Sequence, residues 1–190
     1  VDRANIAIRS RITLTEVESL IHQAKAMPLS LHEFLDKLNS RVRLATTWIA
    51  QLEEEVPCVY RSGDAAQASS VDQIEWMKGM RHALADDKTK GGACSHLLDL
   101  CSEGVRIPVE ITSMKMLQIE VDAKNWSQKA EKWIPRSTET KKGKVEDLRE
   151  HLRKAEMLRD RLPVDDKEKW SLEFEAKLRI IVCNADKWFE

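Results

Sequence analysis

Residues 30–48 decide the fold class, and they read SLHEFLDKLNSRVRLATTW. Ser30 followed three positions later by Glu33 is the pattern of a capping box, in which two side chains satisfy exposed amides at a helix start. Apolar residues then recur every three or four positions, as on one face of a helix. These residues are Leu31, Phe34, Leu35, Leu38, Val42 and Ala45. The stretch therefore predicts a long amphipathic helix that runs past Trp48.

The same helix signals occur along the whole chain. Further capping boxes pair Thr13 with Glu16, Ser70 with Gln73, and Asp165 with Glu168. The most strand-like stretch, residues 105–111, is interrupted by Pro108. We therefore predict helices at 1–9, 14–27, 31–55, 72–86, 94–103, 111–133, 144–161 and 166–189. Long helices favour an all-α fold, an elongated, repeat-like bundle of about six to eight antiparallel helices.

A degenerate repeat combines proline turns with tryptophan helix ends. The turns contain Pro28, Pro108 and Pro163, each followed by an aliphatic residue. Because the residue before proline is disfavoured in the helical region, each turn is expected to end one helix and start another. The long helices that follow contain Ala-x-x-Trp, ending at Trp48, Trp126 and Trp188. We interpret these three prolines and three tryptophans as structural anchors.

The alternative for the tryptophans is a binding role, because exposed indoles are common hot spots of protein interfaces. Helical spacing favours the core for Trp48, Trp126 and Trp188. Trp76 and Trp170 have no place in the repeat. They are therefore the first indoles to examine for exposure, and they are candidate interaction residues.

Breaks in the helical pattern predict the domain organisation. Residues 1–134 are expected to form a helical bundle with polar loops near 59–70 and 86–92, which contain turn residues and lack apolar periodicity. Residues 135–143 form a polar break. Residues 144–190 are expected to form a C-terminal helical hairpin that packs on the bundle or extends it.

Composition excludes several classes of protein. The 190 residues include 31 basic and 32 acidic side chains and 42% hydrophobic residues, which argues against a disordered chain or a surface built wholly for nucleic acid or membrane. Four cysteines are too sparse for a disulfide framework, so a reducing intracellular compartment is expected. No apolar stretch is long enough to span a bilayer. The chain lacks an initiator methionine, so we expect a piece of a longer protein.

Motifs for catalysis and cofactor binding are not recognisable in the sequence. It contains no Gly-x-Gly-x-x-Gly, Walker loop, Gly-x-Ser-x-Gly or His-Glu-x-x-His pattern. Cys94, His96 and Cys101 are close in sequence, but a structural zinc site usually has four ligands. We therefore expect no enzyme activity, no metal or other cofactor and no small-molecule substrate for this chain.

A basic stretch offers an alternative function. Residues 124–161 contain twelve Lys and Arg against seven acids, most densely at Lys141, Lys142 and Lys144. Such a stretch can contact the phosphates of DNA or a nucleosome if its cations share one face. The interleaved acids favour an ordinary solvated helix surface instead. Lys141, Lys142 and Lys144 remain candidate interaction residues.

The stretch from Leu97 to Val109 carries a family resemblance. It reads LLDLCSEGVRIPV and continues through Met114, Leu117 and Val121 to Trp126. In its leucine-rich helix, glycine, aliphatic-Pro-Val turn and final tryptophan, it resembles the PLU-type helical domain of the Lid class of jumonji histone demethylases. The resemblance implies a nuclear parent enzyme that uses iron(II) and 2-oxoglutarate to demethylate lysine four of histone three. Iron, 2-oxoglutarate and zinc are expected only elsewhere in that parent, and no catalytic residue is carried over to this chain.

The leading hypothesis is therefore a non-catalytic scaffold. It would orient the flanking catalytic and reader domains of a chromatin regulator and bind protein partners of the complex. One alternative is a basic module that contacts DNA or a nucleosome through residues 124–161. Others are a spectrin-like structural rod, whose regular period the proline spacing does not match, and an all-helical enzyme with an unrecognised pocket.

Overall fold

The computed structural model describes residues 12–27, 31–56, 70–85, 93–134, 144–162, 167 and 170–187. Within these ranges the chain forms seven helices and two very short strands. The helices are α2 (Leu14–Ala26), α3 (His32–Glu55), α4 (Ser70–Ala85), α5 (Ala93–Gly104), α6 (Thr112–Glu131), α7 (Val145–Asp160) and α8 (Glu175–Asp186). The strands are β1 (Ile12–Thr13) and β2 (Val109–Glu110). The predicted all-α fold is confirmed.

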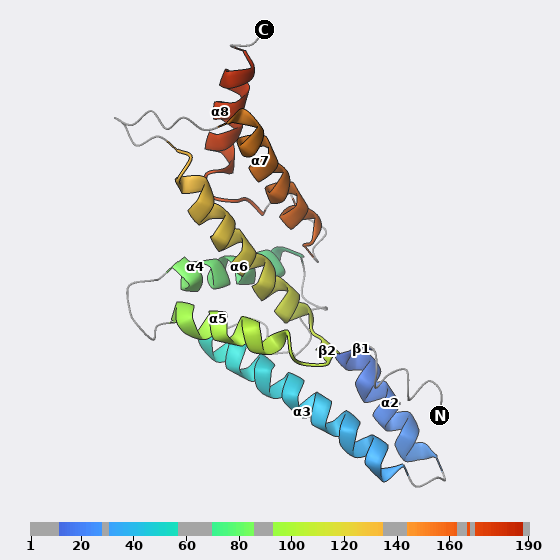
Figure 1. The fold of residues 1–190 in the computed structure, drawn as a ribbon. Coiled ribbons are helices and arrows are strands. Elements are labelled where there is room, and N and C mark those ends of the chain that lie inside the picture. The colour runs from blue at the N-terminus through green and yellow to red at the C-terminus, as the bar shows by residue number, and fades with distance from the viewer. Residues whose placement is uncertain are drawn as a thin grey trace.

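The helices succeed one another along an elongated molecule (Figure 1). Helices α2 and α3 form a hairpin at one end, and α3 packs on α5. Helices α4, α5 and α6 pack against one another in the middle, α6 contacts α7, and α7 packs on α8 at the other end. One cluster of buried apolar side chains extends from Val17 in α2 to Leu178 in α8. The core is therefore continuous although the molecule is long.

The two strands join the N-terminal hairpin to the turn before α6. Ile12 pairs with Val109, and Thr13 pairs with Glu110, in parallel register. This turn contains Pro108, whose carbonyl accepts a hydrogen bond of 3.5 Å from Nη1 of Arg41 in α3. The strand pair was not predicted, because two residues are too few to show an alternating pattern.

Predicted capping boxes had different outcomes. The Thr13–Glu16 box is confirmed, and its hydrogen bonds to Thr13 lower the pKa of the Glu16 carboxyl. Helix α3 has Leu31 as its N-cap residue, and Leu31 makes no side-chain cap hydrogen bond. The Glu33 carboxylate pairs instead with Lys37 at 2.8 Å. Ser70 is already helical, so it does not precede α4 as an N-cap. Ser30, Asp165 and Glu168 lie outside the described residues.

The prediction of one helix over residues 166–189 is wrong at its start. Helix α8 begins only at Glu175, after Phe174 with a left-handed φ of 71°. Trp170 and Leu172 before it are both buried. In a helix, residues two apart point about 200° away from each other, so both could not face one core. A non-helical backbone allows both side chains to enter it.

Several predicted features fall on residues that the structure does not describe. They are the helix at 1–9, the loop near 59–70 apart from Ser70, the loop at 86–92 and the break at 135–143. Pro28, Pro163, Lys141, Lys142 and Trp188 also lie outside the described residues. Lys144 is described; it is exposed and immediately precedes α7.

Candidate functional site: buried polar contacts and a cleft

Four buried indoles each donate a hydrogen bond to another element. Trp48 donates to the Leu100 carbonyl at 2.8 Å, Trp76 to the Val56 carbonyl at 3.1 Å, Trp126 to the His151 carbonyl at 2.7 Å, and Trp170 to Oε1 of Glu120 at 2.7 Å. The alanines of the Ala-x-x-Trp pattern, Ala45 and Ala123, are buried beside their tryptophans. Each indole therefore combines apolar burial with a directional contact between elements.

The candidate interaction role of Trp76 and Trp170 is contradicted by their burial. Their exposed fractions are 8% and 2%. The repeat describes only tryptophans at helix ends. Trp76 instead covers the C-terminal end of α3 from within α4, and Trp170 reaches the core from a non-helical segment. Neither side chain offers a surface to a partner in this structure.

Glu120 is the most deeply buried charged residue among those described, with an exposed fraction of 0%. Nε and Nη2 of Arg81 in α4 donate to its two oxygens at 2.7 and 2.9 Å. Nη1 of Arg81 donates to the Ser171 carbonyl at 2.6 Å, and the guanidinium lies 5.2 Å from the Trp170 ring centroid. This one carboxylate therefore joins α4, α6 and the segment before α8.

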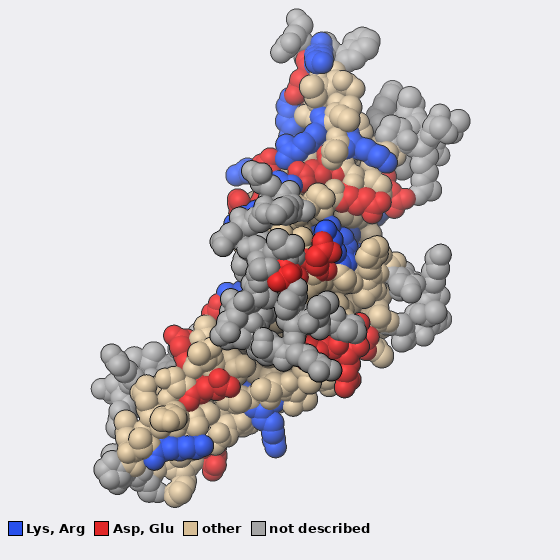
Figure 2. Space-filling view, turned by 180° about the vertical axis from the view of Figure 1, so that it is seen from behind, with Lys and Arg blue, Asp and Glu red and all other residues tan. Residues whose placement is uncertain are grey.

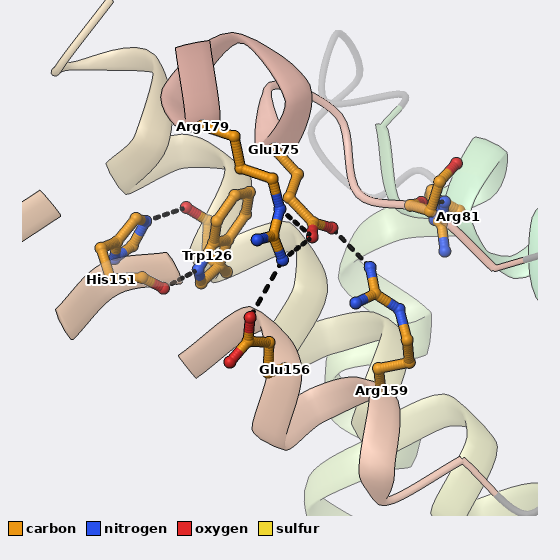
Figure 3. Close-up of polar contacts among 8 residues, drawn as sticks. Arg81, Trp126, His151, Glu156, Arg159, Glu175 and Arg179 are labelled. Atoms are coloured by element: carbon orange, nitrogen blue, oxygen red, sulfur yellow. Dashed lines mark hydrogen bonds and ion pairs between the residues drawn. The ribbon is translucent and has the colours of Figure 1, made fainter. Parts of the chain in front are cut away.

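A second buried carboxylate joins α7 to α8 (Figure 3). Glu175, 7% exposed, accepts a hydrogen bond of 2.7 Å from Nη2 of Arg159. Arg179 donates to the same carboxylate from Nε at 3.2 Å and from Nη2 at 2.9 Å, and reaches Glu156 at 3.1 Å. These carboxylates, Glu175 first, raise the pKa of Arg179. The pair of helices is thus fixed by charge as well as by apolar contact.

All the buried side-chain nitrogen and oxygen atoms in the described part of the chain have hydrogen-bond partners. A buried polar group without a partner would cost about 1–3 kcal/mol, so complete pairing allows these charges to be kept in the core. Sequence reasoning missed Arg81, Glu120, Glu156, Arg159, Glu175 and Arg179. For Glu120 a signal existed, because it shares a helix face with Met116, Leu117 and Ala123, all buried.

A cleft of about 390 Å³ lies between α4, α6 and the segment before α8. Its lining includes two cationic side chains, Arg81 and Lys124, and two acidic ones, Glu131 and Glu173. Apolar lining comes from Ala85, Ala123, Leu172 and Phe174. The described lining contains Ser127 but no histidine that could activate it as a nucleophile. The cleft is therefore a groove of mixed polar and apolar lining, and its described residues contain no serine–histidine pair.

The three residues weighed as zinc ligands have separate contacts. The buried Cys94 sulfur accepts a hydrogen bond of 2.8 Å from Lys124 Nζ, and Nδ1 of His96 lies 2.9 Å from Glu55. Burial, with a smaller effect of Asp122, raises the pKa of the Cys101 thiol. Among the described residues, no three His, Cys, Asp or Glu side chains are placed to share a metal ion.

The described arginine and lysine side chains of α7, and Arg161 at its C-cap, are paired with acids. Arg149 contacts Asp186, Arg153 and Lys154 contact Glu150, Arg159 contacts Glu175, and Arg161 contacts Asp122. Figure 2 shows acidic and basic side chains next to one another at the α7–α8 end. This mixture differs from the single positive face that phosphate binding needs.

Comparisons with known proteins do not assign the chain to a family, since no family model, curated protein or solved structure matches it. In the described ranges, no helix combines the length and the hydrophobicity needed to cross a bilayer.

Proposed function

We propose that the chain is a non-catalytic helical scaffold that holds its two ends at a fixed distance and orientation and carries protein interactions. The observation that supports this function is a directional polar contact at successive helix junctions. Trp48 joins α3 to α5, Arg81 joins α4 to Glu120 of α6, Trp126 joins α6 to α7, and Arg159 joins α7 to Glu175 of α8.

Directional contacts matter because apolar burial alone does not fix how helices are rotated or shifted relative to one another. A bidentate guanidinium–carboxylate pair or an indole–carbonyl bond is satisfied only in one arrangement. A slip at a junction would leave buried charges or carbonyls without partners. An elongated chain of junctions fixed in this way transmits its geometry from the α2–α3 hairpin to the α7–α8 hairpin.

Distances between two nitroxide labels, measured by double electron–electron resonance, test this rigidity. Nitroxides introduced through unnatural amino acids at Asn39 in α3 and Asn184 in α8, both exposed, report the separation of the two hairpins. We expect one narrow distance distribution. Glu175→Gln, which weakens the α7–α8 junction, should broaden it, while Glu53→Gln on the exposed face of α3 should leave it unchanged. A broad distribution in the unmodified chain would contradict a fixed spacer.

For the biological setting we propose a nuclear chromatin regulator that resembles a lysine-four histone three demethylase. The support is the sequence resemblance around residues 97–126. In this setting the scaffold would orient catalytic and reader domains and bind protein partners, while iron, 2-oxoglutarate and zinc would belong to other domains. Sequencing the parent transcript tests this setting. A jumonji iron-binding motif and a Cys-rich finger upstream would support it, and a parent without them would contradict it.

The second candidate function is nucleic-acid binding through residues 124–161, including Lys144. The ion pairs of α7 disfavour it, because cations already paired with acids release fewer counterions on binding phosphate. Titration of a fluorescent DNA duplex at about 50 mM salt distinguishes the two functions. The scaffold predicts no binding, whereas binding that weakens steeply with added salt would favour the nucleic-acid module.

A further inference from the structure

Cys94 and Lys124 form a contact that the scaffold function does not need. Cys94 is the second residue of α5, Lys124 lies on the facing helix α6, and Nζ to Sγ is 2.8 Å. Cys94 is 4% exposed, whereas Lys124 lines the cleft that opens to solvent. A small polar reagent can therefore reach Lys124 through the cleft, and the amine of Lys124 contacts the Cys94 sulfur.

We propose that Cys94 and Lys124 are an oxidation-dependent modification site, at which hydrogen peroxide produces a sulfur–nitrogen crosslink between α5 and α6. A helix N-terminus and a neighbouring amine are both surroundings in which protein thiols act as nucleophiles. Cys94 has both of them. Cys101 lies near the other end of α5 and therefore lacks the helix N-terminus.

The chemistry proceeds in two steps. The Cys94 sulfur attacks one peroxide oxygen, the oxygen–oxygen bond breaks, and a sulfenic acid and one water form. After Lys124 loses its ammonium proton to water, its amine attacks the sulfenic sulfur, the sulfur–oxygen bond breaks, and the hydroxyl leaves as water with an amine proton. In total, one thiol, one amine and one peroxide give one sulfenamide and two waters. Sulfur is oxidised by two electrons, and peroxide is reduced by two.

Distance favours the amine as the trapping group. Protein sulfenic acids condense with whichever thiol or nitrogen is within reach, and Lys124 Nζ already contacts the sulfur. Cys101 is seven residues away on the same helix, which corresponds to about 10 Å along its axis. A disulfide needs Cα atoms within about 7 Å, so Cys94 and Cys101 cannot pair while α5 is intact.

Mass spectrometry of the peroxide-treated chain tests the proposal. We expect the intact mass to fall by two hydrogen atoms, a tryptic species that links the Cys94 and Lys124 peptides, and recovery of both peptides after dithiothreitol. Lys124→Arg keeps a cationic donor but has no nucleophilic amine, so it should fold normally and form no link. Cys94→Ser should also abolish the link.

Cys101→Ser is the matched control, because it removes the other cysteine of α5 and should leave the link intact. Circular dichroism of each variant shows whether its helices are retained. The proposal would be overturned if the tryptic species that links the Cys94 and Lys124 peptides were absent from the treated chain or from treated Cys101→Ser. Treated protein that carried only sulfinic or sulfonic acid at Cys94, or no modification there, would overturn it as well.

Discussion

Trp126 and His151 bind each other's backbone across the α6–α7 junction. Trp126 Nε1 donates to the His151 carbonyl at 2.7 Å, and His151 Nε2 donates to the Trp126 carbonyl at 3.1 Å (Figure 3). Their rings are stacked, with centroids 4.7 Å apart and planes 5° from parallel. Because each residue acts as both donor and acceptor, rotation of α7 against α6 would break two bonds and the stack together.

This junction should make stability sensitive to pH. Burial, together with the nearby cations Lys154 and Lys129, lowers the pKa of His151 from its usual value of 6.5, although its bond to the Trp126 carbonyl acts in the opposite direction. The unfolded chain therefore gains the proton at a higher pH than the folded chain. The stability that comes from keeping His151 neutral is therefore fully present above pH 6.5, the usual pKa of histidine, and is lost as the pH falls below it.

Thermal unfolding between about pH 7.5 and 5.5 measures the effect. The unsubstituted chain should lose more stability over this pH range than the His151→Gln variant, whose amide can still donate to Trp126 but does not titrate. His22→Gln, at an exposed site on α2, is the control and should follow the unsubstituted chain. Identical pH curves for the unsubstituted chain and His151→Gln would show that His151 does not titrate with folding.

The buried carboxylate of Glu120 should be strongly stabilising in its present surroundings. Glu120→Gln keeps an oxygen for Trp170 but leaves the Arg81 guanidinium without its ion pair. Breaking one side of a buried pair costs about 3 kcal/mol. Urea denaturation should therefore show a lower free energy of unfolding by about that amount, with little change in the slope.

Two comparisons separate the ion pair from general damage. The double variant with Arg81→Met and Glu120→Leu should recover only part of the loss, since apolar residues can replace a buried pair but leave the Trp170 indole without its acceptor. Glu150→Gln removes an exposed pair with Lys154 and should cost less than about 1 kcal/mol. If Glu120→Gln were no more damaging than Glu150→Gln, the buried network would not hold the helices as described.

Local patterns predicted most of the fold. Apolar periodicity and turn residues placed six of the seven described helices to within about two residues, because these helices bury one face of a regular period. The start of α8 was missed because the capping-box pattern at Asp165 says nothing about Trp170 and Leu172, which enter the core together. That requirement comes from packing against residues that are distant in sequence.

The polar contacts were harder to predict than the helices. Arg81 and Glu120 are 39 positions apart, and neither has a neighbour in sequence that marks it as a partner of the other. Trp76 and Trp170 were singled out as candidates for exposure because they are outside the repeat. Membership of a repeat says where an indole lies along a helix, whereas its burial depends on which element faces it.

The capping box of α2 should hold the first turn of that helix. The Thr13 hydroxyl accepts a hydrogen bond of 3.3 Å from the Glu16 amide, and the Glu16 carboxylate accepts one of 2.8 Å from the Thr13 amide. Thr13→Ala should therefore lower stability by about 1 kcal/mol and speed hydrogen exchange in the first turn. Thr15→Ala, also exposed but inside the helix, should not have this effect. Equal exchange rates in both variants would contradict a role for the cap.

Gly104 should be intolerant of even one added methyl group. A Cβ there would lie 3.0 Å from the Trp48 ring and from Met114, and Trp48 cannot retreat without losing its hydrogen bond to α5. Gly104→Ala should therefore destabilise the chain by about 1–3 kcal/mol in urea denaturation. Among the described residues, the only atom close to a Cβ at Gly79 is a Val56 methyl at 3.3 Å, and alanine favours a helix interior by about 1 kcal/mol. Gly79→Ala should consequently be neutral or stabilising, and equal losses in the two variants would refute tight packing at Trp48.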